Sequence, residues 1–178
     1  MKKVAILVLA FCMVFLAACG STSPSDALKA DLEDAKSSPD AIIGEVGTDT
    51  FGEQATELLI NKVLEFQYEL GEETVDGDTA TVETTITTYP FGEIFNDVVN
   101  DFIDEAYANP SIASDEAALT ALLDELMTKA LNDADMTYVA TISIELKKDG
   151  NSWVVQESDD LSNALTGGML DFANGVLG

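Results

Sequence analysis

Apolar residues recur at helical spacing in two stretches near the start of the chain. Leu28, Leu32 and Ala35 are separated by four and three residues, which predicts a helix from residue 26 with Pro24 near its start and Pro39 beyond its end. A broken apolar stretch follows over residues 41 to 46, and a second helix is predicted over residues 50 to 61. The apolar face of the second helix consists of Phe51, Ala55, Leu58 and Leu59.

The apolar period then changes from about 3.6 residues to two, the spacing of a strand with one buried face. Residues 64 to 70 and 79 to 89 alternate in this way, and Gly71 indicates a bulge or bend next to the first stretch. The Asp76-Gly77 pair is typical of a two-residue hairpin turn in which both central residues have positive φ. Two further strands are predicted over residues 138 to 146 and 153 to 155, with a turn at Gly150 between them.

Two amphipathic helices are predicted between the second and third strands. Pro90 opens the first helix, Asn109 and Pro110 end it, and Ser114 is the expected N-cap of the second. Because the joining loop is short, we expect the two helices to pair as an αα-hairpin. The apolar positions of the first helix are Phe91, Ile94, Phe95, Val98, Val99, Phe102, Ile103 and Ala106.

Helices that precede two antiparallel hairpins predict an α+β domain rather than a parallel α/β one. The expected fold has N-terminal helices packed on a curved antiparallel four-stranded sheet, with the αα-hairpin inserted between strands 2 and 3. The tail from residue 160 to 176 has short helical spacing interrupted by Gly167 and Gly168. Residues 26 to 178 are long enough to bury a genuine core, so we expect a single domain.

The first 18 residues have the pattern of an export signal. Lys2 and Lys3 precede an uncharged run over residues 4 to 18, which is shorter than the roughly 20 residues needed to span a bilayer. The run closes with Leu16-Ala17-Ala18-Cys19, which resembles the lipobox of a bacterial lipoprotein signal. The resemblance implies cleavage before Cys19 and lipidation of its thiol. An ordinary cleavable signal with an incidental cysteine, or an uncleaved anchor helix, is the alternative.

This interpretation divides the chain into three parts. Residues 1 to 18 form a signal peptide that is removed, residues 19 to 25 form the lipidated cysteine and a flexible tether of small polar residues, and residues 26 to 178 form the domain. The expected location is the extracytoplasmic face of a cell membrane, to which the protein is attached through lipid at Cys19. A Gram-positive membrane and a Gram-negative outer membrane are both compatible with this interpretation.

The charge of the chain excludes several functions. It contains 33 acidic and eight basic residues, no histidine, and a formal net charge of −25. Nucleic-acid binding and electrostatic adhesion to anionic headgroups are excluded, because both need a basic surface. Imidazole catalysis, histidine-containing triads and the usual zinc sites are excluded as well. Both cysteines, Cys12 and Cys19, lie in the signal region, so the domain has no thiol and we predict no cofactor.

Carboxylates are the abundant reactive groups, and pairs of them arise by chance at this composition. We interpret them as polar helix faces and turns rather than as the facing pair of a glycosidase. The segments 76–78 and 133–135 alternate Asp with one other residue but lack the glycine and glutamate of an EF-hand loop. No metal site is therefore predicted.

Several strand and turn segments carry a resemblance to a known family. They are Tyr68-Glu69, residues 75–82, residues 144–150, Trp153-Val154-Val155 and residues 163–168. They resemble uncharacterised exported lipoproteins of Gram-positive bacteria whose domain is of the nuclear-transport-factor-2-like, or cystatin-like, type. The resemblance implies that type of fold and a function that is itself unknown, and it supplies no catalytic residues.

The leading hypothesis is a non-catalytic, lipid-anchored module that binds a small apolar ligand, a wall component or another envelope protein. The alternative, by fold analogy, is an isomerase or dehydratase that uses the cavity of such a fold with a carboxylate base and a tyrosine donor. Tyr68, Tyr138 and Trp153 lie on apolar strand faces and are the candidates to line the cavity, although the pattern favours core aromatics whose hydroxyls are hydrogen-bonded. An enclosed polar cavity with a carboxylate beside Tyr68 or Tyr138 would favour the enzyme.

Overall fold

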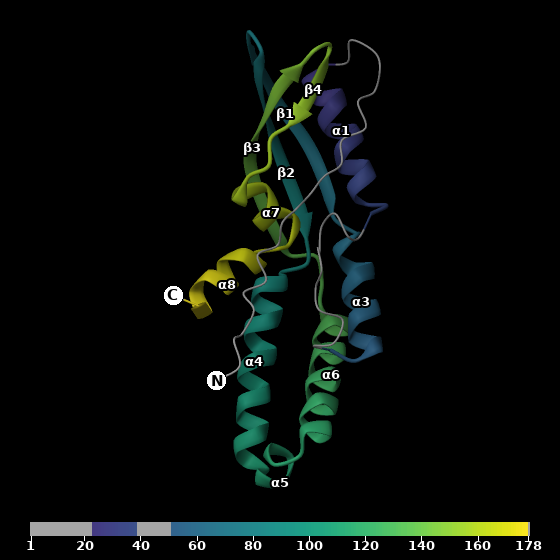
Figure 1. Cartoon of the computed structure of the whole chain (residues 1–178), viewed down its shortest axis with the longest axis vertical. Coiled ribbons are helices and arrows are strands. Elements are labelled where there is room, and N and C mark those ends of the chain that lie inside the picture. The colour runs from purple at the N-terminus through teal and green to yellow at the C-terminus, as the bar shows by residue number, and fades with distance from the viewer. Residues whose placement is uncertain (1–22, 39–50, 178) are drawn as a thin grey trace.

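The computed structural model describes residues 23–38 and 51–177 (Figure 1). The predicted signal peptide, Cys19 and the apolar stretch over residues 41 to 46 lie outside the described residues. Within the described part of the chain, no helix is long and apolar enough to cross a membrane. The elements are α1 (Pro24–Ala35), α3 (Glu53–Val63), β1 (Gln67–Asp76), β2 (Thr79–Thr88), α4 (Phe91–Ala108), α5 (Pro110–Ala113), α6 (Glu116–Asp133), β3 (Tyr138–Asp149), β4 (Ser152–Val155), α7 (Asp159–Leu165) and α8 (Met169–Leu177).

The fold is the predicted α+β arrangement. Four antiparallel strands follow one another in the order β1-β2-β3-β4, and the helical hairpin of α4, α5 and α6 is inserted between β2 and β3. The sheet occupies one end of an elongated molecule, and the hairpin extends to the other end (Figure 1). Of the N-terminal helices, α1 packs on the sheet, whereas α3 packs against α6.

The core lies on one face of the sheet. Along β2, every second residue from Ala80 to Thr88 is buried, while the residues between them are partly or fully exposed. This face is covered by α1, through Leu28 and Leu32, and by α7. Thr85 and Thr141 lie on the opposite face, where their hydroxyl oxygens are 2.9 Å apart. The alternation in the sequence thus separates a packed face from a polar one.

The first hairpin turn differs from the expectation. Asp76 and Thr79 are still paired, so the loop residues are Gly77 and Asp78, and Gly77 alone has a positive φ, of 63°. The prediction that Asp76 and Gly77 form the centre with two positive φ angles was wrong. A glycine at the first loop position is the pattern of a type II′ turn, which spares a residue with a Cβ from the left-handed region.

Two other boundaries also differ, and one local prediction is confirmed. Alternation from residue 64 predicted an early strand, but β1 begins at Gln67 because the chain is still turning out of α3. The N-cap of α6 is Asp115 and not Ser114, since the Asp115 carboxylate accepts hydrogen bonds from the first turn of the helix. The bulge expected at Gly71 is present, as a register shift between Leu70 and Glu73.

The turn between α7 and α8 rests directly on the start of α4. The Gly92 N–H donates a hydrogen bond of 3.0 Å to the Gly167 carbonyl oxygen. Gly167 has a φ of 55°, and a Cβ on it would overlap the carbonyl oxygen of Tyr89. The backbone of Gly167 is thus in direct contact with the backbone of Tyr89 and Gly92. This contact fixes α7 and α8 at the junction of the sheet and the helical hairpin.

Candidate functional site

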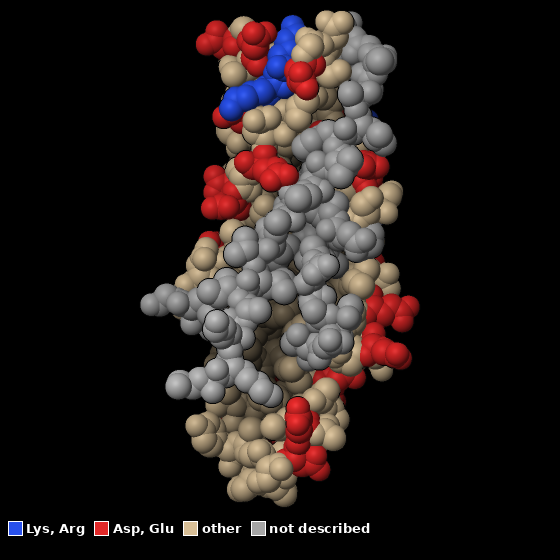
Figure 2. Space-filling view, in the orientation of Figure 1, with Lys and Arg blue, Asp and Glu red and all other residues tan. Residues whose placement is uncertain are grey.

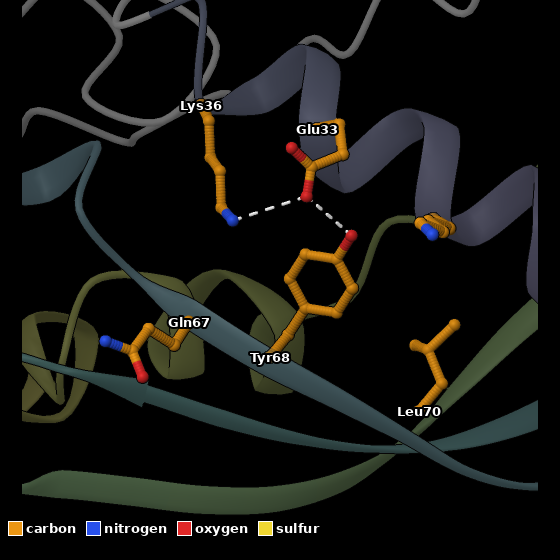
Figure 3. A pocket seen from close by; sticks show the side chains of 6 residues that line it. Glu33, Lys36, Gln67, Tyr68 and Leu70 are labelled. Atoms are coloured by element: carbon orange, nitrogen blue, oxygen red, sulfur yellow. Dashed lines mark hydrogen bonds and ion pairs between the residues drawn. The ribbon is translucent and has the colours of Figure 1, made fainter.

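An open hollow lies between α1 and β1, with a volume of about 460 Å³ (Figure 3). That volume is in the range of sites for small molecules. Both polar and apolar side chains face it. The lining residues are Lys29, Glu33, Lys36, Gln67, Tyr68 and Leu70.

The two walls of the hollow, α1 and β1, run in opposite directions. Ser25, in the first turn of α1, donates to the Glu73 carboxylate through its backbone N–H at 2.9 Å and its hydroxyl at 2.5 Å. Two turns later, Glu33 faces Tyr68, near the start of β1. Glu33 and Lys36 are three residues apart, the spacing that places two helix residues on one side. The start of α1 is itself capped by Ser23, whose hydroxyl accepts from the Asp26 N–H at 3.1 Å.

Glu33 joins the two walls of the hollow. Its Oε1 accepts a hydrogen bond of 2.6 Å from the Tyr68 hydroxyl and lies 3.3 Å from the Lys36 ammonium (Figure 3). These contacts, the tyrosine hydrogen bond first, lower the pKa of Glu33. Burial and the same hydrogen bond raise the pKa of Tyr68 to about 12. At neutral pH the pair is therefore a carboxylate and a neutral phenol whose O–H is already engaged in a hydrogen bond.

The hollow is locally basic in an acidic molecule. The Lys36 ammonium also lies over two aromatic rings, 5.3 Å from the Phe66 centroid and 4.8 Å from the Tyr68 centroid. Lys29 and Lys36 face one lining carboxylate, Glu33. On the face of the molecule in Figure 2, acidic side chains are spread along its length. The hollow can therefore donate hydrogen bonds to a ligand and bind its negative charge, which most of the acidic surface cannot do.

A second tyrosine–glutamate pair lies between α3 and the end of β2. The Tyr89 hydroxyl donates to Glu65 Oε2 at 2.6 Å, and the Lys62 ammonium lies 3.9 Å from the centroid of the Tyr89 ring. The hydrogen bond and burial raise the pKa of Tyr89 to about 12. Tyr89 is only 8% exposed, so this pair connects the segment after α3 to the end of β2 rather than facing a ligand.

One carboxyl of α1 has an unusual pKa. Asp31 is half-buried, and its burial, together with the nearby charge of Asp34, raises its pKa to about 6. It is not among the lining residues of the hollow. Its effect is on stability, since folding favours the protonated form.

The three aromatic residues proposed to line a cavity are not brought together. Tyr68 lines the hollow, but Tyr138 lies at the start of β3, with its ring facing Gly168. Trp153 pairs with Lys148 at the opposite end of β3, about 33 Å from Tyr138 at 3.3 Å per residue. The sequence interpretation missed the two lysines and Glu33 because polar residues on a helix are usually solvated. Their spacing of four and three residues, which collects two lysines on one face of an acidic chain, was the available signal.

Acidic side chains are the candidate metal ligands in residues 23–38 and 51–177. No group of three or more acidic side chains there is arranged to hold an ion. Two carboxylates near the hollow, Glu33 and Glu73, are engaged by hydroxyl, amide and ammonium groups.

Comparison with known proteins gives one structural similarity. No known family profile matches the chain, and no curated protein is significantly similar to it. The crystal structure of a candidate lipoprotein, YcdA, from Bacillus subtilis is similar, with 17% sequence identity and a TM-score of 0.44. The similarity covers 80% of this chain and 47% of that chain, so this chain spans about half the length of that protein. At this level the likeness does not assign a family.

Proposed function

We propose that this chain is a lipid-anchored, extracytoplasmic binding protein, and that its ligand enters the hollow between α1 and β1. The proposal includes lipid at Cys19 and a domain of the nuclear-transport-factor-2-like type, in which helices cover one face of an open antiparallel sheet. The observation that carries it is the hollow itself, which is locally basic and is built partly on α1. This helix begins at Pro24, so it includes the last two residues of the predicted tether, residues 19 to 25.

Chain length supports the position next to a membrane. Cys19 precedes Pro24 by five residues, which span at most about 18 Å when fully extended. The hydrogen bonds from Ser25 to Glu73 then hold the start of α1 against β1, close to the hairpin loop that contains Gly77. Lipid at Cys19 would therefore keep this end of the sheet near the membrane and direct the helical hairpin away from it.

The state of the polar groups favours binding over catalysis. A catalytic tyrosine donor needs an O–H that is free to donate to the substrate, but the Tyr68 O–H is hydrogen-bonded to Glu33. A general base works best with a pKa near the working pH, whereas that of Glu33 is lowered. The hollow is also open, which leaves reacting groups in water. The lining favours a ligand whose hydrogen-bond acceptors or negative charge face Lys29 and Lys36.

The isomerase-like alternative keeps one supporting observation, the carboxylate of Glu33 at 2.6 Å from the Tyr68 hydroxyl. It predicts turnover that Glu33→Gln abolishes without a loss of ligand binding. The binding proposal predicts no turnover for the unchanged protein either.

Lipidation is tested by metabolic labelling with palmitate. Cys19→Ala should lose the label and membrane attachment, whereas Cys12→Ala, which changes the other cysteine of the signal region, should keep both. Equal labelling of the two variants would overturn the anchor.

Binding is tested by a thermal-shift screen of small carboxylates and phosphate esters on the mature domain. A ligand of the hollow should raise the melting temperature of the unchanged domain and lose that effect in Lys36→Ala. Lys129→Ala, on the exposed side of α6, is the matched control and should behave like the unchanged domain. A shift that survives Lys36→Ala, or no shift with any compound, would contradict the site.

A further inference from the structure

An apolar row on α4 continues beyond the part of the helix that the rest of the protein covers. Phe95, Val99, Ile103 and Tyr107 follow at intervals of four residues, so they lie along one side of the helix. Phe95 is covered, with ring centroids 5.8 Å from Phe51 and 6.3 Å from Phe172 of α8. The next three residues are 39%, 43% and 84% exposed, increasing toward the tip of the hairpin. We call Val99, Ile103 and Tyr107 the tip stripe.

The surroundings of the tip stripe are strongly acidic. Residues 91 to 133, which form the hairpin, contain ten acidic residues and Lys129 as their one basic residue. On α4 itself there are five acidic residues and no basic one. Asp104 directly follows Ile103, so a carboxylate stands about 100° around the helix from the stripe. An apolar row on an acidic hairpin complements a segment that is apolar on one side and basic on the other.

We propose that the tip stripe docks a basic amphipathic helix of another protein. The stripe is about 12 Å long at 1.5 Å per residue, which matches two to three turns of a partner helix with apolar residues at i, i+4 and i+8. Lysine or arginine beside those positions would be attracted by the acidic residues of the hairpin. A second copy of this chain fits less well, because it would bring two molecules of net charge −25 together with no basic residue on either α4.

The location also suits a partner from outside the chain. The hairpin extends away from the sheet, and α5 lies at the far end of the molecule (Figure 1). The covered start of the row, where Phe172 contacts Phe95, shows that this side of α4 already packs against a helix. The partner helix would extend that packing toward Tyr107. The inference does not depend on the ligand of the hollow.

The probe is a synthetic helix of about 14 leucine and lysine residues with its leucines at helical spacing, compared with an isomer of the same composition in scrambled order. Binding to the mature domain is measured by fluorescence anisotropy at low and high sodium chloride. We expect the patterned helix to bind at least about tenfold more tightly than the scrambled one, and to weaken as salt screens the charges.

Two variants identify the surface. Ile103→Lys and Tyr107→Ser should each weaken binding of the patterned helix by about tenfold. Val139→Lys, on the outer face of the sheet at a side chain that is 61% exposed, makes the same change of charge elsewhere and should weaken it by less than about threefold. Melting temperatures should stay close to that of the unchanged domain, because all three positions are at the surface.

Three results would overturn the proposal. They are equal binding of the patterned and scrambled peptides, equal loss in Ile103→Lys and Val139→Lys, and a dimer of the unchanged domain in light scattering that Ile103→Lys converts to a monomer. The last result would mean that the stripe pairs with a second copy.

Discussion

Replacing Gly167 with alanine tests the close contact that fixes α7 and α8 on the start of α4. The added Cβ would overlap the Tyr89 carbonyl oxygen, and the residue would have to keep a φ of 55°. The left-handed conformation costs a residue with a Cβ about 1–2 kcal/mol. Moving backbone to relieve the overlap adds about 1–3 kcal/mol, as for overpacked cores. We therefore expect Gly167→Ala to lower the free energy of unfolding by about 2–5 kcal/mol.

Gly77→Ala is the matched control, because Gly77 has nearly the same φ, 63°, but nothing within 4 Å of the added Cβ. It should show the conformational cost alone, about 1–2 kcal/mol. Urea denaturation followed by circular dichroism measures both variants. In a thermal scan each kcal/mol corresponds to about 2–4 °C for a domain of this size. Equal losses in the two variants would mean that the Gly167 turn does not approach Tyr89 in solution.

Three further predictions concern the polar groups. Asp31→Asn should raise the free energy of unfolding by about 1 kcal/mol at pH 7 and leave it unchanged below pH 4. The pKa of Asp31 is about 6 in the folded state and 3.8 in the unfolded state, so stability falls as the pH rises from 3.8 to 6. This difference in pKa corresponds to about 3 kcal/mol. We expect a smaller effect on the free energy of unfolding, because the carboxyl is only half-buried and water screens it. Tyr89→Phe should cost about 1–2 kcal/mol in urea denaturation, and more than Tyr68→Phe, because Tyr89 is buried and Tyr68 reaches an exposed carboxylate. Melting temperatures in EDTA and in millimolar calcium should nearly coincide; a rise of more than about 10 °C with calcium would reveal a metal site.

The elements of the fold were accessible from the sequence because their patterns are local. The period of two along β2 and β3, the Pro90 start of α4 and the glycine pair between α7 and α8 each depend on neighbouring residues. The boundary errors arose where two local signals compete. Ser114 and Asp115 are both good N-caps, and the structure uses Asp115 while the Ser114 hydroxyl donates to the Pro110 carbonyl oxygen instead.

The candidate site depends on contacts that no local pattern encodes. Glu33 and Tyr68 are 35 residues apart, and they meet because α1 crosses the sheet antiparallel to β1. Tyr138 and Trp153 share an apolar strand face with Tyr68 in the sequence pattern, but the length of β3 keeps them apart. The sequence also could not show which part of the apolar row on α4 is exposed. The exposed Val99 and Ile103 have the same spacing as the buried Ile94 and Val98. Which part of an amphipathic helix is covered depends on the length of its neighbours.

The most direct test of the central claim is the intact mass of the full chain purified from membranes in detergent. A lipid-anchored binding protein should begin at Cys19 and carry the additional mass of a diacylglycerol and its acyl chains on that residue. The Cys12→Ala chain should give the same mature mass, because residue 12 would be removed with the signal. A chain that begins at Met1, or one cleaved elsewhere without added lipid, would contradict the account.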